Sequence, residues 1–273
     1  MKLPEKLHRW LRIPYILHIK RRGKRGPIVI LLHGLASYGE IWDETVSELS
    51  QDYRCVQVDL LGHGQSPMPS RLLYDTTDHE RSLAWTFFWR GIWGKKIFVT
   101  HSMGGIIAVR YAALHPRNVR KLILVGLPVY RRGEAGEESK KFESLLDKGI
   151  LVFYRAMRAL PKSTAIRSAA ALMRALPRIA GTAILNDKTW YPAVSSLAHT
   201  IELQTVLTDM EKIPAQLPIT LIYGRLDQFV LSSNLKLVKK NRPSTKLVPI
   251  VTYHEISSKT TRPIVRAVKQ HNY

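Results

Sequence analysis

The feature that most constrains this chain is a regular alternation of short apolar runs with longer amphipathic stretches. Continuous apolar runs predict buried strands, and the stretches between them predict helices. Strands that are apolar on both faces and separated by helices are typical of a parallel sheet covered on both sides, so the sequence predicts an α/β fold. We expect strands at 15–20, 27–34, 54–60, 96–100, 119–126, 218–224 and 245–251, and helices at 39–50, 76–92, 104–116, 231–240 and 259–270.

The alternation is interrupted between the predicted strands at 119–126 and 218–224. Residues 128–212 contain several helical segments, and Pro214 and Pro218 mark the return to the sheet. An insert at this point lies over the carboxyl ends of the strands, where open parallel sheets bind their ligands, and we interpret it as a helical lid. The predicted organisation is a first core segment at 1–127, a lid insert at 128–212 and a second core segment at 213–273.

Cysteine content and hydropathy indicate the cellular compartment of the protein. Cys55 is the only cysteine, so no internal disulfide can form. A chain without disulfides favours a reducing compartment, and we expect the cytoplasm. No apolar run reaches the length of a membrane span, and charged residues interrupt the first twelve positions, so we expect neither a spanning segment nor a secretory signal.

The positive charge raises nucleic acid and anionic membranes as partners. The chain has 42 basic and 21 acidic side chains, a formal net charge of +21, and the excess is spread along its length. No helix-turn-helix, zinc-finger or RNA-binding signature accompanies it, so we expect no specific nucleic-acid binding. Residues 148–186 contain seven basic residues and no acid, which leaves weak contact of the lid with an anionic membrane surface as an open alternative.

The stretch FVTHSMGG, residues 98–105, ends a predicted strand at a serine followed by two glycines. A nucleophile presented on a strained strand-to-helix turn needs small residues two positions before it and two after it. Gly104 meets the second condition, whereas Thr100 stands where glycine is usual. The flanking strand and helix supply the required context, so Ser102 is a candidate nucleophile, with an ordinary loop as the alternative.

Three further stretches follow the ends of other predicted strands. HGLASYGEIW (33–42) places backbone amides beside the strand end, as an oxyanion hole requires. YGRLDQFV contains Asp227, and VTYHEISS contains His254. The carboxyl ends of parallel strands meet at one edge of the sheet, and the chain order Ser102, Asp227, His254 is that of a catalytic triad on such a sheet.

With these motifs the chain resembles the α/β-hydrolase superfamily, in particular its lid-bearing branch of serine esterases, lactonases and carbon–carbon bond hydrolases. The resemblance covers about residues 15–270 and includes DLLGHGQS (59–66), similar to the family's aspartate–glycine–histidine–glycine loop with Leu61 where arginine is frequent. Thr252 and Tyr253 stand where glycines are common. The resemblance implies the α/β-hydrolase fold, a mostly parallel central sheet with helices on both faces and a helical lid.

The resemblance also implies roles for individual residues. Ser102 would attack a carbonyl carbon, His254 would take its proton, and Asp227 would hold the imidazole. The backbone N–H groups of Leu35 and Met103 would receive the oxyanion. The implied activity is hydrolysis of a small-molecule carboxylic ester, with an apolar acyl group, without cofactor or metal. Lactonase, carbon–carbon bond hydrolase and non-catalytic small-molecule binding remain alternatives.

The residue type at position 102 separates branches of the superfamily. Haloalkane dehalogenases and epoxide hydrolases of this superfamily use an aspartate nucleophile, so a serine argues against both activities. No cluster of histidine, cysteine and carboxylate has metal-ligand spacing. We therefore expect no metal site. No feature of the sequence indicates the oligomeric state.

Several other polar and aromatic residues receive structural interpretations. Asp59 also lies at the carboxyl end of a predicted strand but precedes the serine, which makes it only an alternative triad acid. Trp85, Trp89 and Trp93 recur every four residues and predict a stripe packed against the sheet, with an aromatic binding platform as the alternative. We expect loop-ordering or packing roles for His33, His63 and His101.

Overall fold

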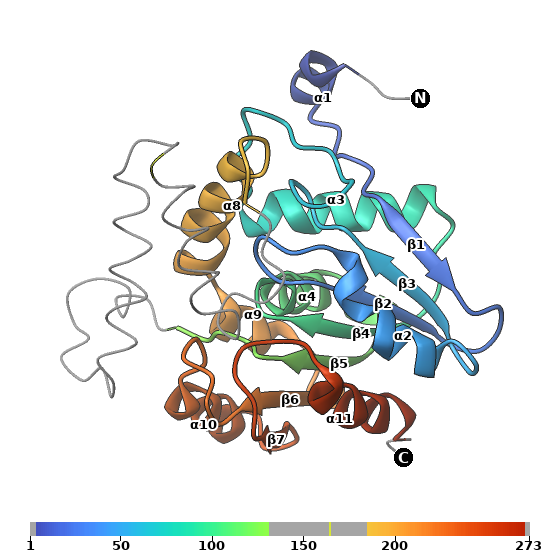
Figure 1. The fold of residues 1–273 in the computed structure, drawn as a ribbon, viewed down its shortest axis with the longest axis vertical. Helices are drawn as coiled ribbons and strands as arrows, with labels where there is room; N and C mark the ends of the chain where they lie inside the picture. The colour runs from blue at the N-terminus through green and yellow to red at the C-terminus, as the bar shows by residue number, and fades with distance from the viewer. Residues whose placement is uncertain (1–3, 131–163, 165–184, 271–273) are drawn as a thin grey trace.

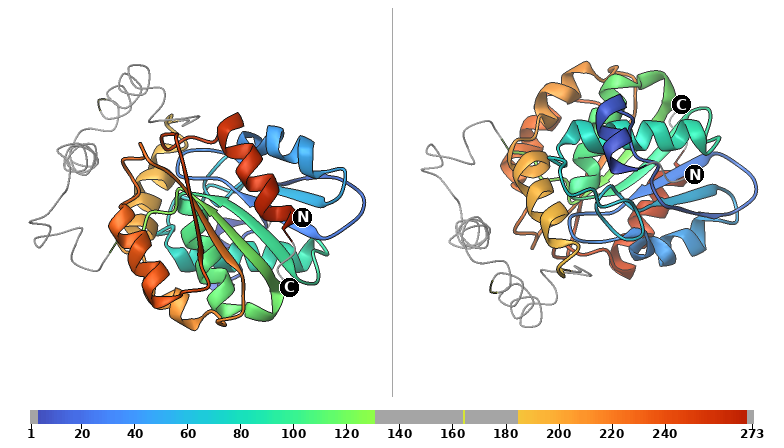
Figure 2. Two further views of the ribbon diagram at one scale, coloured as in Figure 1. Left: turned by 90° about the horizontal axis from the view of Figure 1, so that it is seen from below. Right: turned by 90° about the horizontal axis from the view of Figure 1, so that it is seen from above.

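The structure, a computed structural model, describes residues 4–130, 164 and 185–270. Within these residues seven strands form one sheet with helices on both faces, as predicted (Figures 1 and 2). The strand order is β1-β3-β2-β4-β5-β6-β7, and every neighbouring pair from β3 to β7 is parallel. The strands are β1 (Ile19–Arg22), β2 (Ile28–Leu32), β3 (Arg54–Val58), β4 (Lys96–His101), β5 (Val119–Val125), β6 (Ile219–Gly224) and β7 (Lys246–Ile250).

The helices form a layer on each side of the sheet. On one face α3 (Thr76–Trp89), α4 (Met103–Leu114), α9 (Val206–Lys212) and α10 (Ser232–Asn241) contribute to one apolar core. On the other face α2 (Asp43–Leu49) and α11 (Ser258–Lys269) contribute to a second core. The remaining helical segments are α1 (Glu5–Leu11), η1 (Gly39–Trp42), η2 (Pro116–Asn118), α8 (Trp190–Ser196) and the π-helix η3 (Leu197–Glu202).

The central strands are buried on both faces, which explains their unbroken apolar runs. In β2 the side chains of Ile28, Ile30 and Leu32 lie in the first core, whereas those of Val29 and Leu31 lie in the second. Successive side chains of a strand point to opposite faces, so a strand between two helix layers has no polar side.

The edge strand differs from its prediction. It was expected at 15–20, but β1 spans Ile19–Arg22 and pairs with β3 in the antiparallel direction. The preceding backbone bonds to side chains instead of a strand: the Leu17 amide donates to Thr86 Oγ1 at 2.8 Å, and the His18 amide to Ser66 Oγ at 2.8 Å. Because these groups are already paired, ladder pairing begins later in the chain than the apolar pattern indicates.

The described end of the predicted insert packs onto the core. Helix α9 lies against α4, where Val206 and Met210 join the first core. Arg110 of α4 forms an ion pair with Asp209 of α9 at 2.9 Å. Residues 131–163 and 165–184, with most of the basic stretch 148–186, lie outside the described residues, so the lid and the domain division stay predictions. None of the helices in the described part has the length and apolarity needed to cross a bilayer.

The prediction that the tryptophan stripe of α3 packs against the sheet is wrong. Trp89 and Trp93 are 58% and 62% exposed, whereas Leu83 and Phe87 of the same helix are buried in the core. Trp85, only partly buried, lies two residues from Leu83, about 200° around the helix. Two apolar stripes of helical period therefore compete in this segment, and the smaller aliphatic and phenyl side chains are the ones that face the sheet.

Candidate active site

Ser102 occupies the turn between β4 and α4 in an unusual backbone conformation. Its φ is 50° and its ψ is −120°, outside the regions that a serine ordinarily adopts. Two hydrogen bonds hold this turn: the Ser102 amide donates to the Val125 carbonyl at 2.9 Å, and the Gly105 amide donates to the Ser102 carbonyl at 2.8 Å. Such a residue costs of order 1–3 kcal/mol and persists only where its surroundings impose it.

Glycines after Ser102 allow α4 to approach the sheet closely. A Cβ atom at Gly104 would lie 2.5 Å from the His33 carbonyl oxygen and 2.8 Å from that of Leu32. A Cβ atom at Gly105 would lie 2.8 Å from the Leu127 side chain. The first helical turn thus rests on the end of β2, which brings the serine next to the loop that follows β2.

The departure from the family pattern at Thr100 is accommodated inside the core. The side chain is fully buried, and a Cβ at Gly105 would lie 3.3 Å from Thr100 Oγ1. Among the residues that the structure describes, this hydroxyl has no hydrogen-bond partner. A threonine therefore fits beneath the turn at the energetic cost of one unsatisfied hydroxyl.

Asp227 and His254 form a buried pair. Asp227 follows β6 and His254 follows β7, and the His254 Nδ1 and Asp227 Oδ2 atoms are 2.7 Å apart. The second carboxylate oxygen of Asp227 accepts the Phe229 amide at 2.8 Å, which fixes the orientation of the carboxylate. When Nδ1 donates to the carboxylate, Nε2 of the neutral imidazole is free to accept a proton.

Small residues at the strand ends bring this pair to the edge that carries Ser102. A Cβ at Gly126, just after β5, would lie 3.2 Å from His254 Cε1 and 3.4 Å from Asp227 Oδ2. The ring centroids of His101 and His254 are 4.8 Å apart, and His101 immediately precedes Ser102. The three predicted site residues therefore gather at the carboxyl ends of neighbouring strands.

The loop after β2 carries the predicted oxyanion donors. A Cβ at Gly34 would lie 3.1 Å from the Cβ of Ser102, which places the neighbouring Leu35 next to the serine. Ala36 in the same loop has a φ of 54°. Met103 is the first residue of α4, where amide groups have no partner within the helix. Both backbone donors thus belong to segments that adjoin Ser102.

His33 orders this loop as a neutral side chain, in agreement with its predicted role. Its Nε2 accepts the Leu60 amide at 2.9 Å, and its Nδ1 lies 2.7 Å from the Gly34 carbonyl, to which it donates. Complete burial lowers the pKa of His33 to about 3. Burial also lowers the pKa of His63 to about 4 and that of His101 well below its ordinary value.

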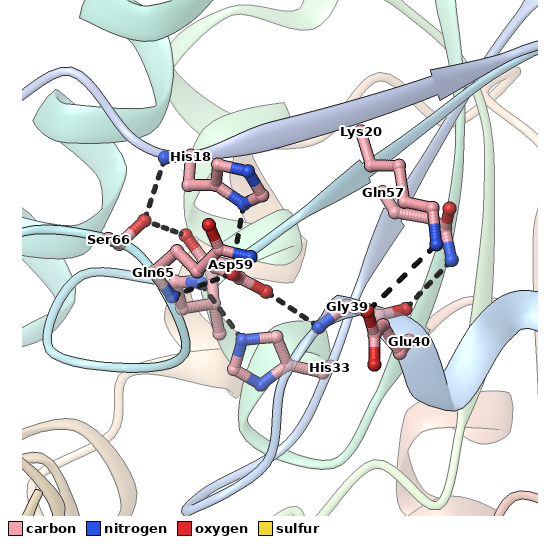
Figure 3. A network of polar contacts seen from close by, with 10 residues as sticks. His18, Lys20, His33, Gly39, Glu40, Gln57, Asp59, Gln65 and Ser66 are labelled. Carbon is pink, nitrogen blue, oxygen red and sulfur yellow. Dashed lines mark hydrogen bonds and ion pairs between the residues drawn. The ribbon is translucent and has the colours of Figure 1, made fainter.

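Asp59, the alternative acid, is engaged in a different network (Figure 3). One carboxylate oxygen accepts the Gly39 amide at 2.7 Å. The other accepts the Gln65 amide at 2.8 Å and lies 3.1 Å from His18 Nδ1. These bonds join the segment just before β1, the start of η1 and the loop after β3, so the carboxylate of Asp59 orders loops while that of Asp227 contacts His254.

The departures before His254 also have a structural account. A Cβ at Gly224 would lie 2.3 Å from the Thr252 carbonyl oxygen and 2.7 Å from that of Tyr253, so the histidine loop lies directly on the end of β6. The Thr252 hydroxyl donates to Glu255 Oε1 at 2.7 Å. This bond links the residues on either side of His254, and it uses a threonine side chain at a position where glycine is common in the family.

One contact residue of the site was missed at the level of sequence. The ring of Phe229 lies with its centroid 4.6 Å from that of His254, and the Tyr130 hydroxyl donates to the Phe229 carbonyl at 3.1 Å. The position of Phe229, two residues after Asp227 in YGRLDQFV, was the available signal. Among the described residues, no three histidine, cysteine or carboxylate side chains form a group that could hold a metal ion.

Comparison with known proteins identifies related sequences and folds. A family model described as alpha/beta hydrolase fold matches residues 27–258. The chain is 38% identical over 104 residues to the probable lysophospholipase BODYGUARD 4 of Arabidopsis thaliana, a match that covers 37% of this chain and 25% of that protein. It is 31% identical over 120 residues to epoxide hydrolase 4 of Mus musculus, covering 41% of this chain and 31% of that protein. The matched stretches thus span less than a third of these relatives.

Solved structures resemble the chain over nearly its whole length. An esterase from Exiguobacterium antarcticum superposes with a TM-score of 0.74 and covers 94% of this chain and 99% of its own, at 18% identity. At that identity the likeness concerns the fold alone. The predicted arrangement of sheet and helices is confirmed by this likeness and by the matched family model.

Proposed function

Because the chain belongs to the α/β-hydrolase fold family, we propose that it is a serine hydrolase that cleaves carboxylic esters through Ser102, His254 and Asp227. The observation that carries the proposal is the backbone of Ser102, held at φ 50° and ψ −120° at the same sheet edge as the Asp227–His254 pair. Backbone strain at a residue of this type is typical of a functional position.

The proposed reaction follows from the roles that these groups can take. His254 Nε2 accepts the proton of Ser102 as Oγ attacks the carbonyl carbon of the ester. Asp227 stabilises the imidazolium, and the amides of Leu35 and Met103 donate to the oxyanion. The tetrahedral intermediate collapses to an acyl-enzyme as the alcohol leaves with the proton from His254. Water, deprotonated by His254, then hydrolyses the acyl-enzyme and releases the carboxylic acid and the free serine.

The serine at this turn favours ester hydrolysis over the chemistry of one named relative. Epoxide hydrolases of this superfamily use an aspartate nucleophile, and this chain has Ser102 at the corresponding turn. The Arabidopsis relative is named as a probable lysophospholipase, and lysophospholipases as a class hydrolyse a carboxylic ester. We propose an ester with an apolar acyl group as the substrate, in keeping with the expectation from the sequence.

Active-site labelling combined with turnover tests the proposal. Purified protein is treated with a fluorophosphonate, and its intact mass is measured by mass spectrometry. In parallel, hydrolysis of p-nitrophenyl esters of increasing acyl length is followed. We expect one adduct on Ser102 and hydrolysis of at least one ester, both lost in Ser102→Ala and kept in the control Ser47→Ala on α2. A folded protein that neither reacts with the probe nor hydrolyses any ester of the series would instead be the non-catalytic small-molecule binder.

A further inference from the structure

An exposed aromatic cluster covers the outer side of the C-terminal part of α3 and the segment just after it. Trp85, Phe88, Trp89 and Trp93 form the aromatic patch. The ring centroids of Trp85 and Trp89 lie 5.6 Å apart, and those of Phe88 and Trp93 lie 5.3 Å apart. Phe88, Trp89 and Trp93 are 53%, 58% and 62% exposed. Large aromatic side chains gathered in the open mark an interaction surface, because isolated proteins rarely leave contiguous apolar patches in water.

The core does not require these rings. The opposite side of α3 supplies Leu83 and Phe87 to the first core, and the Phe87 ring packs against those of Phe98 and Tyr111. The aromatic patch is therefore an addition to a helix that is already anchored. Its rings can leave water only by contact with something outside the described fold.

Basic side chains flank the patch along the chain. Arg81 lies one helical turn before Trp85, Arg90 directly follows Trp89, and Lys95 lies two residues after Trp93; all three are exposed. Arg21 of the edge strand β1 donates to the Arg90 carbonyl, so the basic strand edge adjoins the end of α3.

The acidic residues of α3 are Asp78 and Glu80, which both precede the aromatic rings in the helix. Glu80 is buried and faces His115, with Oε1 and Nε2 2.8 Å apart. Asp78 lies in the first turn of the helix, where its Oδ2 accepts the Tyr74 amide at 3.0 Å. The exposed rings therefore have arginine and lysine as their charged neighbours along the chain.

Helix α1 extends this surface. It lies outward of α3 in Figure 1 and in the right-hand view of Figure 2, and its Trp10 is 79% exposed. Arg81 Nη2 donates to the Arg12 carbonyl at 3.0 Å, which ties the end of α1 to α3. A cavity of about 430 Å³ lies between the two helices, lined by basic side chains and by two acids. Its charged lining residues are Lys6, Arg12, Arg71, Arg81, Glu5 and Asp78.

We infer that the face formed by α1 and the aromatic patch docks on an anionic lipid bilayer. Tryptophan is suited to the boundary between headgroups and acyl chains, because its ring is apolar and its N–H is polar. The flanking arginine and lysine side chains complement anionic headgroups. This inference concerns where the protein lies rather than what it hydrolyses, so it is independent of the proposed function.

Charge and ring geometry favour a bilayer over two other occupants. A second copy paired through this face would bring the basic rims of two chains of net charge +21 against each other. Single-stranded nucleic acid binds on rings whose faces are open to stacking. Here Phe88 packs edge to face with Trp89 at 87° and with Trp93 at 86°, and it stacks on Trp85 at 18°, so ring faces of the patch are already engaged with one another.

Vesicle co-sedimentation of the full chain tests the inference. The vesicles are phosphatidylcholine alone and an equimolar mixture of phosphatidylcholine and phosphatidylglycerol, at low and physiological salt. One variant carries Phe88→Ser, Trp89→Ser and Trp93→Ser, and a second carries Arg81→Gln and Arg90→Gln. The matched control carries Lys236→Gln and Lys240→Gln, two exposed residues of α10, which lies at the opposite end of the molecule in Figure 1. It removes the same charge as the second variant.

We expect the wild type to bind the anionic vesicles, more strongly at low salt, and to bind phosphatidylcholine alone weakly. Each arginine removed should lower the partition coefficient about fivefold, the equivalent of about 1 kcal/mol per basic residue at an anionic surface. The arginine variant should therefore lose about 25-fold, the aromatic variant should also lose binding, and the lysine control should stay within about twofold of the wild type.

Four results would overturn the inference. The first is a wild type that does not bind anionic vesicles at low salt. The second is an equal loss in the arginine variant and the lysine control, which would indicate a general cationic surface. The third is a dimer in sedimentation velocity that the aromatic variant abolishes, without vesicle binding. The fourth is binding of a single-stranded oligonucleotide, but not vesicles, through the same residues. Should the aromatic variant misfold, the arginine variant and its control still decide the matter.

Discussion

The glycine at position 104 allows the most direct test of how packing positions the proposed nucleophile. In Gly104→Ala the new methyl group would lie 2.5 Å from the His33 carbonyl oxygen and 2.8 Å from that of Leu32. Both atoms belong to the backbone, so neither can rotate away. A tolerable contact is 3.0–3.4 Å, so α4 must move from the end of β2 by about 0.5–0.9 Å.

Two opposing terms set the expected stability. Overpacking of a core costs about 1–3 kcal/mol, and a contact with two backbone oxygens belongs at the upper end of that range. Alanine in place of glycine within a helix stabilises the folded state by about 1 kcal/mol through its higher helix propensity. We therefore expect Gly104→Ala to lower the free energy of unfolding by about 2 kcal/mol.

The effect on activity should exceed the effect on stability. Ser102 moves with α4, whereas Leu35 stays with the loop after β2, so the displacement separates the proposed nucleophile from a proposed oxyanion donor. A misplacement of about 1 Å costs of order 100-fold in rate. Esterase kcat/KM should therefore fall by roughly 30- to 100-fold in a protein that is still folded at room temperature.

The neighbouring glycine supplies the control. In Gly105→Ala the contact at 2.8 Å is with Leu127 Cδ1, the end of a side chain that can rotate. Its cost should be offset by helix propensity, leaving stability within about 0.5 kcal/mol of wild type. Urea unfolding and p-nitrophenyl ester kinetics measure both variants. If Gly104→Ala matched wild type in both assays, or if Gly105→Ala were equally impaired, the packing argument would be refuted.

The remaining predictions concern the triad, the buried hydroxyl and pH. Asp227→Asn should lower kcat by about 10⁴-fold and Ser102→Ala by about 10⁶-fold with unchanged circular dichroism, and near-normal kcat in either would contradict the proposed roles. Thr100→Val should raise the free energy of unfolding by about 1–2 kcal/mol in urea, since it removes the unpaired hydroxyl; destabilisation would mean that this hydroxyl has a partner. The folded pKa values of His33 and His63, about 3 and 4, lie below the unfolded value of about 6.5. Between pH 6.5 and 4 the unfolded chain therefore binds more protons, and each of these histidines should lower stability by about 1.4 kcal/mol per unit of falling pH, which urea titrations at several pH values would measure. A stability independent of pH over that range would mean that these side chains are not held neutral.

The helix layers and most strand positions could be predicted because they are recorded locally. Strands with both faces covered must be apolar at every position, and β2 and β5 show this in Ile28–Leu32 and in the run from Leu122 to Val125. The turn at Ser102 also has a local sequence signal, because the close approach of α4 to the sheet requires glycine at position 104. Such signals need no knowledge of the partner element.

Choices between equivalent candidates depended on contacts far apart in the chain. Asp59 and Asp227 both follow a strand, and only the folded chain shows that the carboxylate of Asp227 lies 2.7 Å from His254 while Asp59 holds the Gly39 amide. The start of β1 was similarly hidden, because the bonds that occupy the backbone before it come from Ser66 and Thr86.

Sequence by itself determined the α/β alternation, the strained turn at Ser102 and the chain order of Ser102, Asp227 and His254, because backbone preferences and steric limits act on neighbouring residues. Only the tertiary structure decided which side of α3 is buried. Its aliphatic and aromatic stripes have the same helical period, so the pattern alone cannot choose between them. Leu83 and Phe87 meet the sheet, which leaves Trp89 and Trp93 in the open. Burial is a property of what packs against a residue, and that is settled by the whole chain.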